Sequence, residues 1–212
     1  MLKIKCGGTG FFSCCSVKLF HIVEYINLNK KLPDDIEGSD LWSWYKRQID
    51  KNNNRDITFD YFENYNNIKD INIIHSINYH HDDQFKNYSD LDYKGTKPLI
   101  KKYYSPSAEI NKIINKIEKK YKLYYKNICL LFYRGNDKNS ETLKCSYNEY
   151  LNYAELLLKK NPKLMFLVQS DETEFIEFMT NKFPNNSFYF KDEIRHIKKD
   201  ISWTVDKGDF TN

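Results

Sequence analysis

The sequence contains little glycine, proline or arginine. Its 212 residues include 7 Gly and 5 Pro, and arginine occurs at Arg47, Arg55, Arg134 and Arg195. The glycines match neither the G-x-G-x-x-G spacing of dinucleotide-binding turns nor the P-loop, so neither a dinucleotide site nor an ATPase is supported. We attribute the scarcity, and the abundance of Lys, Asn, Ile and Tyr, to an AT-rich genome such as that of a virus.

A strong excess of charge of one sign is also missing. Lys and Arg together number 33 and Asp and Glu 29, which gives a formal net charge of +4. Nearly all positive charges are lysines with acidic residues between them, whereas nucleic-acid-binding domains gather basic residues on one face. We therefore expect no nucleic-acid partner, since a lysine-driven binder would need a continuous basic face.

Paired cysteine motifs and long apolar runs are absent as well. Five cysteines form an odd set without a C-x-x-C pair, which favours free thiols in a reducing compartment. The glycine-rich stretch 7–10 stands where a secretory signal needs its apolar core, and Lys18 and Glu24 interrupt the next apolar stretch. The sequence therefore predicts a cytoplasmic protein, in the host cytoplasm if it is viral, without a membrane partner. The cysteines are Cys6, Cys14, Cys15, Cys129 and Cys145.

The sequence does contain enough apolar material for a packed core. Hydrophobic residues make up 41% and aromatic residues 16% of the chain. In the second half, a capped amphipathic pattern predicts a helix from Ser105 to Tyr121, and the continuous apolar run 128–133 predicts a parallel strand covered on both faces. Further helices are expected at 146–160 and 172–182, and further strands at 164–168 and 187–190. Alternating strands and helices predict βαβ units.

The first half gives weaker signals. Residues 2–5 alternate like a short strand, and the glycine-rich stretch then leads into a helix-like apolar pattern. This order predicts a strand, a glycine loop and a helix. Beyond it we expect an aromatic helix at 41–49, strands at 56–59 and 71–75, and a polar loop at 82–98.

Polar residues follow two of the predicted strands. Arg134 and Gly135 come directly after the strand that ends at Tyr133, and Ser170 and Asp171 follow the next strand. Parallel βαβ units place these strand ends on one edge of the sheet, where ligands bind. A guanidinium on a rigid strand end suits a pyrophosphate leaving group, because its planar donor fork holds two oxygens and neutralises developing charge. Asp171 is equally well interpreted as the N-cap of the next helix.

Two other candidates carry less information. The glycine stretch 7–10 lies at a strand-to-helix turn, where backbone can approach phosphate or sugar closely. The run His80-His81-Asp82-Asp83 contains metal-ligand residue types, but adjacent residues of an extended chain point in opposite directions and no partner histidine has ligand spacing. We therefore expect no metal.

These motifs resemble those of a known protein family. The run Phe132-Tyr133-Arg134-Gly135-Asn136-Asp137-Lys138 resembles the H-x-R-x-x-D-K motif of core α1,6-fucosyltransferases and the related H-x-R-x-G-x-D segment of bacterial and protein O-fucosyltransferases. Further segments resemble stretches of these enzymes in the same order along the chain. They are Gly8-Thr9-Gly10-Phe11, Tyr104-Ser105-Pro106, Val168-Gln169-Ser170-Asp171-Glu172, Lys182-Phe183-Pro184-Asn185 and Ile201-Ser202-Trp203.

The resemblance implies a function and roles for single residues. Arg134 matches the arginine that contacts the pyrophosphate of GDP-fucose, Asp137 and Lys138 match an aspartate and a lysine of the motif, and Glu141 matches a glutamate that activates the acceptor hydroxyl. The implied catalytic residues are Arg134, Lys138 and Glu141. The implied reaction transfers fucose to a glycan or protein acceptor by single displacement, with inversion and without a metal. The implied donor-binding residues are Gly8, Gly10, Phe11, Phe132, Arg134, Asp137, Ser170 and Asp171.

Some features depart from the family pattern. Phe132 stands where the family has histidine, and Gly135 stands where it has a second arginine. The family's final strands and helices, which contact the base and ribose, have no counterpart before Asn212. The expectation is an incomplete second lobe, weak donor binding and poor transfer, with a second polypeptide as a candidate source of the missing strands. The alternative is a catalytically inactive, glycosyltransferase-like protein that binds nucleotide sugars or other proteins.

The predicted fold is α/β with two Rossmann-like lobes, as in GT-B glycosyltransferases. The first lobe is expected at residues 1–104 with the glycine loop, and the donor-binding lobe at 105–212. The donor is expected in the cleft between the glycine loop and Arg134. GDP-fucose would be a substrate, and no cofactor is expected.

Overall fold

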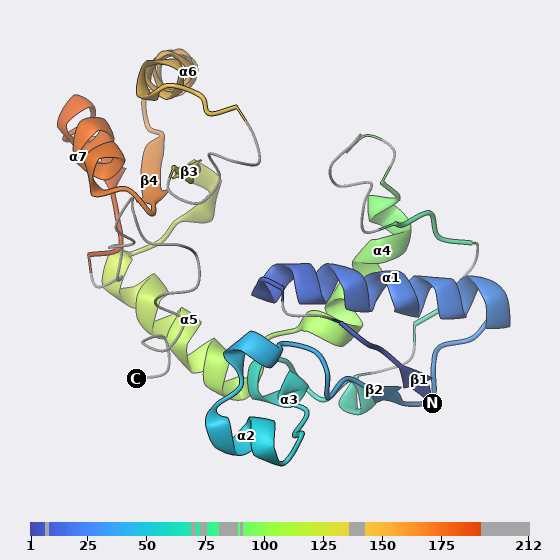
Figure 1. Ribbon diagram of the computed structural model, residues 1–212. Coiled ribbons are helices and arrows are strands. Elements are labelled where there is room, and N and C mark those ends of the chain that lie inside the picture. The colour runs from blue at the N-terminus through green and yellow to red at the C-terminus, as the bar shows by residue number, and fades with distance from the viewer. Residues whose placement is uncertain are drawn as a thin grey trace. The chain divides into compact units, whose positions relative to one another are not determined.

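A computed structural model describes most of the chain (Figure 1). Its described residues are 1–6, 9–68, 71–72, 76–80, 89, 91–135 and 143–191. In this part of the chain, seven α-helices and two small parallel sheets form a mixed α/β fold. The α/β class predicted from the sequence is confirmed at this level.

The chain forms two compact units, Met1–Ile117 and Glu118–Asn212. The division falls inside helix α5 (Ala108–Tyr121), whereas the sequence placed it between residues 104 and 105. The helix expected between Ser105 and Tyr121 is confirmed, and it begins after Ser107, whose hydroxyl accepts a hydrogen bond from the amide of Ile110 at 3.4 Å.

Unit 1 begins with a βαβ arrangement. Strand β1 (Leu2–Lys3) pairs in parallel with β2 (Ile36–Glu37), and helix α1 (Phe11–Asn29) connects them (Figure 1). The strand and the helix predicted for the N-terminus are therefore confirmed, while Gly7 and Gly8 of the loop between them lie outside the described residues. One face of α1 is buried because its apolar residues recur at helical spacing. The buried apolar residues of α1 are Cys14, Leu19, Ile22, Val23 and Ile26.

Two predictions for the middle of unit 1 are wrong. The expected helix at 41–49 is broken, because Trp42 adopts a left-handed conformation with φ 53° while its ring is fully buried. Only a 3₁₀ turn, η1 (Ser43–Tyr45), and the short helix α2 (Gln48–Asn52) remain. The expected strand at 56–59 is the start of helix α3 (Thr58–Tyr61). Asp56 starts it, since its carboxylate accepts a hydrogen bond from the Thr58 amide at 2.8 Å.

Helix α4 (Tyr93–Tyr104) replaces the end of the loop predicted at 82–98. Asp92 caps this helix by accepting a hydrogen bond from the Gly95 amide at 2.7 Å, and the helix continues through Pro98. Another 3₁₀ turn, η2 (Tyr65–Asn67), precedes it. Residues 71 and 72 lie outside any strand, and the rest of the strand expected at 71–75 lies outside the described residues.

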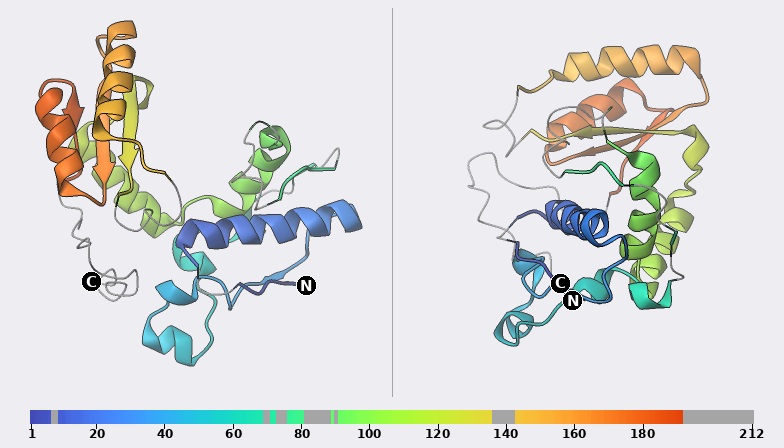
Figure 2. Two further views of the ribbon diagram at one scale, coloured as in Figure 1. Left: turned by 45° about the horizontal axis from the view of Figure 1, so that its top comes forward. Right: turned by 90° about the vertical axis from the view of Figure 1, so that its right-hand side faces the viewer.

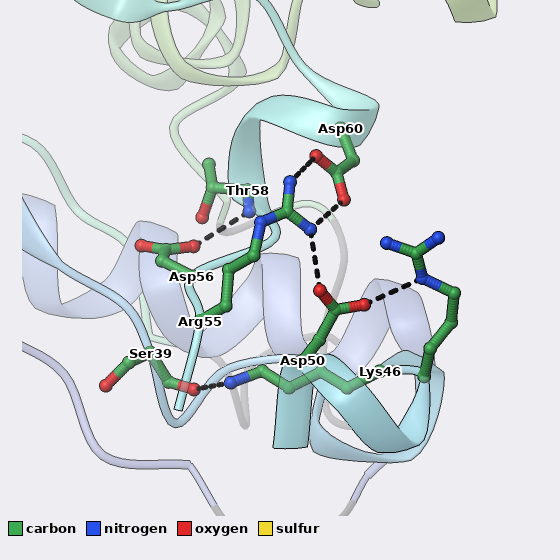
Figure 3. A network of polar contacts seen from close by, with 8 residues as sticks. Ser39, Lys46, Asp50, Arg55, Asp56, Thr58 and Asp60 are labelled. Carbon is green, nitrogen blue, oxygen red and sulfur yellow. Dashed lines mark hydrogen bonds and ion pairs between the residues drawn. The ribbon is translucent and has the colours of Figure 1, made fainter. Parts of the chain in front are cut away.

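A charged network joins α2 to α3 (Figure 3). The Asp50 carboxylate accepts hydrogen bonds from Arg47 Nε at 2.9 Å and from Arg55 Nη1 at 3.1 Å. Arg55 also binds both carboxylate oxygens of Asp60. The hydrogen bond from Arg47, followed by that from Arg55, holds the pKa of Asp50 below its usual range, and Asp60 with Asp50 raises the pKa of Arg55. The network therefore ties the two short helices α2 and α3 to each other.

Replacement of Asp50 by asparagine is expected to lower the thermal midpoint by a few degrees at neutral pH. Because the folded pKa of Asp50 is depressed, its contribution is present above the unfolded pKa of about 3.9 and is lost as the pH falls through the folded value. The difference between the variant and the wild type should therefore shrink in acid. Calorimetry at several pH values measures it. Asp34→Asn is the control, since the Lys31–Asp34 pair is exposed, and an equal effect there would contradict the prediction.

Unit 2 contains the second sheet, with strand order β3-β4-β5 and all strands parallel. Strand β3 (Ile128–Tyr133) has the predicted bounds and follows a 3₁₀ turn, η5 (Tyr125–Asn127). Strand β4 (Met165–Ser170) runs two residues beyond the predicted end, and β5 (Ser187–Phe188) is shorter than expected. The parallel βαβ organisation predicted for this half of the chain is confirmed.

The connecting helices of unit 2, α6 (Tyr147–Lys160) and α7 (Thr173–Lys182), both pack on the sheet (Figure 2). They cover one face, because successive right-handed crossovers in one direction place their helices on the same side. In the described residues the other face is open at β3, where Leu130 is 56% and Phe132 53% exposed. The predicted cover of this strand is thus found on one of its two faces among the described residues. The buried face consists of Leu131, Tyr133, Phe166 and Val168 against Ala154, Phe175, Ile176 and Met179.

Candidate functional site

The carboxyl ends of β3 and β4 lie side by side in unit 2. Tyr133, the last residue of β3, is the register partner of Ser170, the last residue of β4. Arg134 and Asp171 therefore leave the sheet from adjacent strand ends, as the sequence predicts. This edge is where open α/β sheets bind their ligands.

A hydrogen bond joins the two strand ends. The amide of Gly135 donates to Asp171 Oδ1 at 2.8 Å. The N-cap residue of α7 is Glu172, without a side-chain capping bond, so the interpretation of Asp171 as that cap is wrong. Ser170 is buried, and its hydroxyl accepts a hydrogen bond from the Glu172 amide at 2.9 Å. Asp171 thus fixes the loop that carries Arg134, and Ser170 fixes the turn into α7.

Glu172 is a buried carboxylate beneath this loop. Its side chain is 6% exposed, accepts a hydrogen bond from the Tyr147 hydroxyl and lies 3.8 Å from Lys144 Nζ. Burial, followed by the hydrogen bond to Glu172, raises the pKa of Tyr147 well above its usual range. A Cβ atom on Gly135 would lie 2.0 Å from Glu172 Oε1. A side chain at position 135 would therefore force the Glu172 carboxylate to move.

An aromatic cluster holds Tyr133, the residue that precedes Arg134. The buried ring of Tyr133 stacks on Phe175 at 4.8 Å between ring centroids, with an interplanar angle of 17°. Tyr147 and Tyr150 meet the Tyr133 ring edge-on. Burial and the Glu172 carboxylate raise the pKa of Tyr133, which keeps it neutral. Because Tyr133 is fixed, the position of the Arg134 backbone is fixed too.

Sequence reasoning missed Glu172 and its close approach to Gly135. The only sequence signal was their place directly after the two strand ends. Of the predicted residues in this unit, Arg134 is exposed at the edge, and Phe132 is exposed on the sheet face opposite α6 and α7. Asp137, Lys138 and Glu141 lie outside the described residues.

The predicted residues of the glycine loop belong to unit 1. Gly10 precedes α1 with φ −59°, a conformation open to any residue. Phe11 packs its ring among Trp42, Tyr45 and Tyr61. Its amide donates to the Tyr45 hydroxyl at 2.8 Å, and its carbonyl accepts from Trp42 Nε1 at 3.1 Å. These contacts anchor the first turn of α1.

Gly8 lies outside the described residues, and the cleft expected between the glycine loop and Arg134 stays a prediction. No protein-family model matches the chain, and neither a curated protein nor a solved structure was found to be similar to it. The resemblance of residues 132–138 to fucosyltransferases therefore also stays a prediction. Interpretation of the site rests on the chemistry of the two strand ends.

Three polar side chains gather where the chain enters α1. Thr9 Oγ1 lies 3.3 Å from Cys14 Sγ, and Cys6 Sγ lies 4.0 Å from the same sulfur. All five cysteines are free thiols. Burial raises the pKa of Cys6, and burial raises the pKa of Cys15 to about 12. Since the thiolate is the nucleophile, these thiols are poorly reactive at neutral pH.

The described residues contain no group of three or more His, Cys, Asp or Glu side chains that could hold a metal ion. His80 packs against the ring of Phe20 at 4.6 Å between centroids, and His81, Asp82 and Asp83 lie outside those ranges. No helix in the described part of the chain is both long enough and apolar enough to cross a membrane.

Proposed function

We propose that the sheet edge formed by β3 and β4 binds the pyrophosphate of a nucleotide sugar, and that the protein is a glycosyltransferase of the fucosyltransferase type. The supporting observation is the position of Arg134 after β3, with its loop tied to Asp171 after β4 at 2.8 Å. GDP-fucose is the donor that the motif resemblance favours. On this proposal, the sheet of unit 2 is the core of a Rossmann-like lobe in a GT-B arrangement.

The chemistry of the edge suits this ligand. An arginine fork can hold two phosphate oxygens and stabilise the charge that develops on a departing nucleoside diphosphate. The two nearby carboxylates are engaged by donors of the protein, Asp171 by the Gly135 amide and Glu172 by Tyr147 and Lys144. These donors offset the negative charge that would otherwise oppose a phosphate.

The proposed reaction is a single displacement at the sugar carbon. The acceptor hydroxyl attacks that carbon, the bond to the nucleoside diphosphate breaks, and the configuration inverts. Arg134 stabilises the leaving group, Glu141 takes the proton of the acceptor hydroxyl, and Lys138 and Asp137 help to hold the donor. The roles of Glu141, Lys138 and Asp137 are proposed from the resemblance, which also favours a reaction without a metal ion.

Replacement of Arg134 by alanine is expected to weaken binding of GDP and GDP-fucose at least about tenfold, because a charged, two-pronged contact is lost. Titration calorimetry measures the change. The affinity of Arg134→Lys for GDP should lie between that of the wild type and that of Arg134→Ala, since lysine keeps the charge but lacks the two-pronged donor group. Lys159→Ala, which removes an exposed charge from α6, is the control and should bind like the wild type.

Equal GDP affinity of Arg134→Ala and the wild type would refute the proposed site. A donor-hydrolysis and transfer assay, run with and without a chelator, separates the two functional alternatives. Turnover that survives chelation supports a metal-independent transferase. Binding that depends on Arg134 without turnover would instead favour a nucleotide-sugar-binding protein.

A further inference from the structure

Strand β3 forms an edge of its sheet in the described part of the chain. It pairs with β4 through six consecutive register partners, without a bulge, and has no neighbour on its other side among the described residues. Soluble proteins usually protect such an edge with lysine, proline or a bulge, because unpaired backbone groups attract other strands. The strand reads Ile-Cys-Leu-Leu-Phe-Tyr and contains none of these.

The exposed face beside this edge is apolar. Leu130 and Phe132 point to the same face, and each is more than half exposed, at 56% and 53%. Both faces of a parallel sheet are normally covered. An unprotected edge with an uncovered apolar face has the properties of an interface.

The strand is complementary to a second copy of itself. An antiparallel pair about a two-fold axis at Leu131 places Leu130 opposite the partner's Phe132, so apolar side chains meet on one face. Arg134 then lies opposite the partner's Ile128. The alternative axis at Leu130 would bring Arg134 towards the partner's Lys126, which lies in the turn before β3, and like charges close together are unfavourable. Charge therefore favours the first register.

Two neighbouring features are compatible with this pairing. The Tyr150 hydroxyl donates to the Phe132 carbonyl at 2.8 Å, and that carbonyl retains a second lone pair for a partner strand. The same contact shows that α6 lies over the edge strand. Helix α6 also exposes Tyr153, Leu156 and Leu157, which are spaced at i, i+3 and i+4 and form an apolar stripe on this helix.

We propose that two copies of the chain associate through the free edge of β3. The two three-stranded sheets join into one of six strands, with the antiparallel β3 pair at its centre. Leu130 packs against the partner's Phe132. The two proposed pyrophosphate sites, each at the carboxyl end of one β3 strand, lie at opposite ends of this central pair. The partner of each edge is therefore the uncharged strand β3 of the second copy.

Sedimentation velocity over a range of concentrations tests the proposal. The wild type should shift from monomer to dimer as its concentration rises. Leu130→Lys, which places a charge in the interface, should raise the dissociation constant at least about tenfold. Leu28→Lys is the matched control, because Leu28 is 83% exposed on α1 in the other unit, and it should associate like the wild type. Circular dichroism checks that both variants fold.

Amide hydrogen exchange provides a second measurement on the unaltered chain. Peptides covering β3 should gain protection as the concentration rises, while peptides covering α1 should not. If the protein stays a monomer at every concentration, the proposal is wrong. Coverage of the edge by residues 136–142, by residues 192–212 or by another polypeptide would give this result. Dimerisation that is unchanged by Leu130→Lys, without added protection of β3, would also overturn it.

Discussion

Replacement of Gly135 by alanine is expected to destabilise unit 2 by about 3 kcal/mol, because it breaks a buried charged contact. The added Cβ atom would lie 2.0 Å from Glu172 Oε1 and 2.2 Å from Glu172 Cδ. Gly135 has no positive φ, so the cost comes from this collision and not from the backbone conformation. The carboxylate would have to leave Tyr147 and Lys144.

The same substitution should weaken GDP binding, since displacement of the loop moves Arg134. Amide exchange of peptides from β3 and β4 measures the stability of unit 2, and calorimetry measures binding. Gly10→Ala is the control for stability, because its Cβ would meet only Ser13 Oγ at 3.7 Å, an ordinary contact. The control for GDP binding is again Lys159→Ala.

A double-mutant cycle identifies the cause of the effect. When Glu172→Ala has removed the carboxylate, Gly135→Ala should cost less than about 0.5 kcal/mol more, because nothing remains to collide. If the two single effects simply add, the collision with Glu172 does not explain the requirement for glycine.

Removal of the buried ammonium of Lys18 is expected to remove a pH-dependent contribution of up to about 3 kcal/mol to the free energy of unfolding. Lys18 is 1% exposed on α1, with Nζ 5.5 Å from the ring centre of Trp42, 5.8 Å from that of Tyr65 and 6.0 Å from that of Tyr104. Burial lowers its pKa to about 8, and the charge of Asp56 partly opposes this shift. The aromatic rings offset part of the cost of the buried charge.

The sign of the effect follows from proton binding. Between the folded pKa of about 8 and the unfolded pKa of 10.5, the folded protein has released the proton of Lys18 and the unfolded chain has not. Stability contributed by this group therefore rises with pH through that window, by about 1.4 kcal/mol per pH unit. Cys15 acts in the opposite direction above the unfolded pKa of 9.0, because burial raises the pKa of its folded thiol to about 12.

Lys18→Met isolates the lysine, because both proteins retain Cys15. The stability difference, wild type minus variant, should rise by about 2 kcal/mol between pH 7.5 and 9.5. Urea unfolding in a Trp203→Phe background, followed by the fluorescence of Trp42 and Trp44, reports on unit 1. Lys5→Met is the control, since Lys5 is exposed, and its difference should not vary. A flat curve for Lys18→Met would show that the buried ammonium does not titrate in this range.

Some of the fold could be predicted because its causes are local. The apolar run of β3 and the Ser146–Glu149 capping box of α6 depend on residues close in sequence, and the structure has both elements at the predicted positions. The placement of Arg134 at a strand end follows from the same pattern. The resemblance to fucosyltransferases adds a function, which stays a prediction.

Other features depended on residues that only the fold brings together. The left-handed Trp42 is held by burial of its ring and by the Phe11 carbonyl, 31 residues away, so the aromatic pattern around it gave the wrong helix. Asp171 suited a helix cap equally well in the sequence, and the nearby Gly135 amide decided its role. The sequence by itself determined which residues reach the sheet edge. The tertiary structure decided their partners, because a side chain binds whatever the paired strands place within reach.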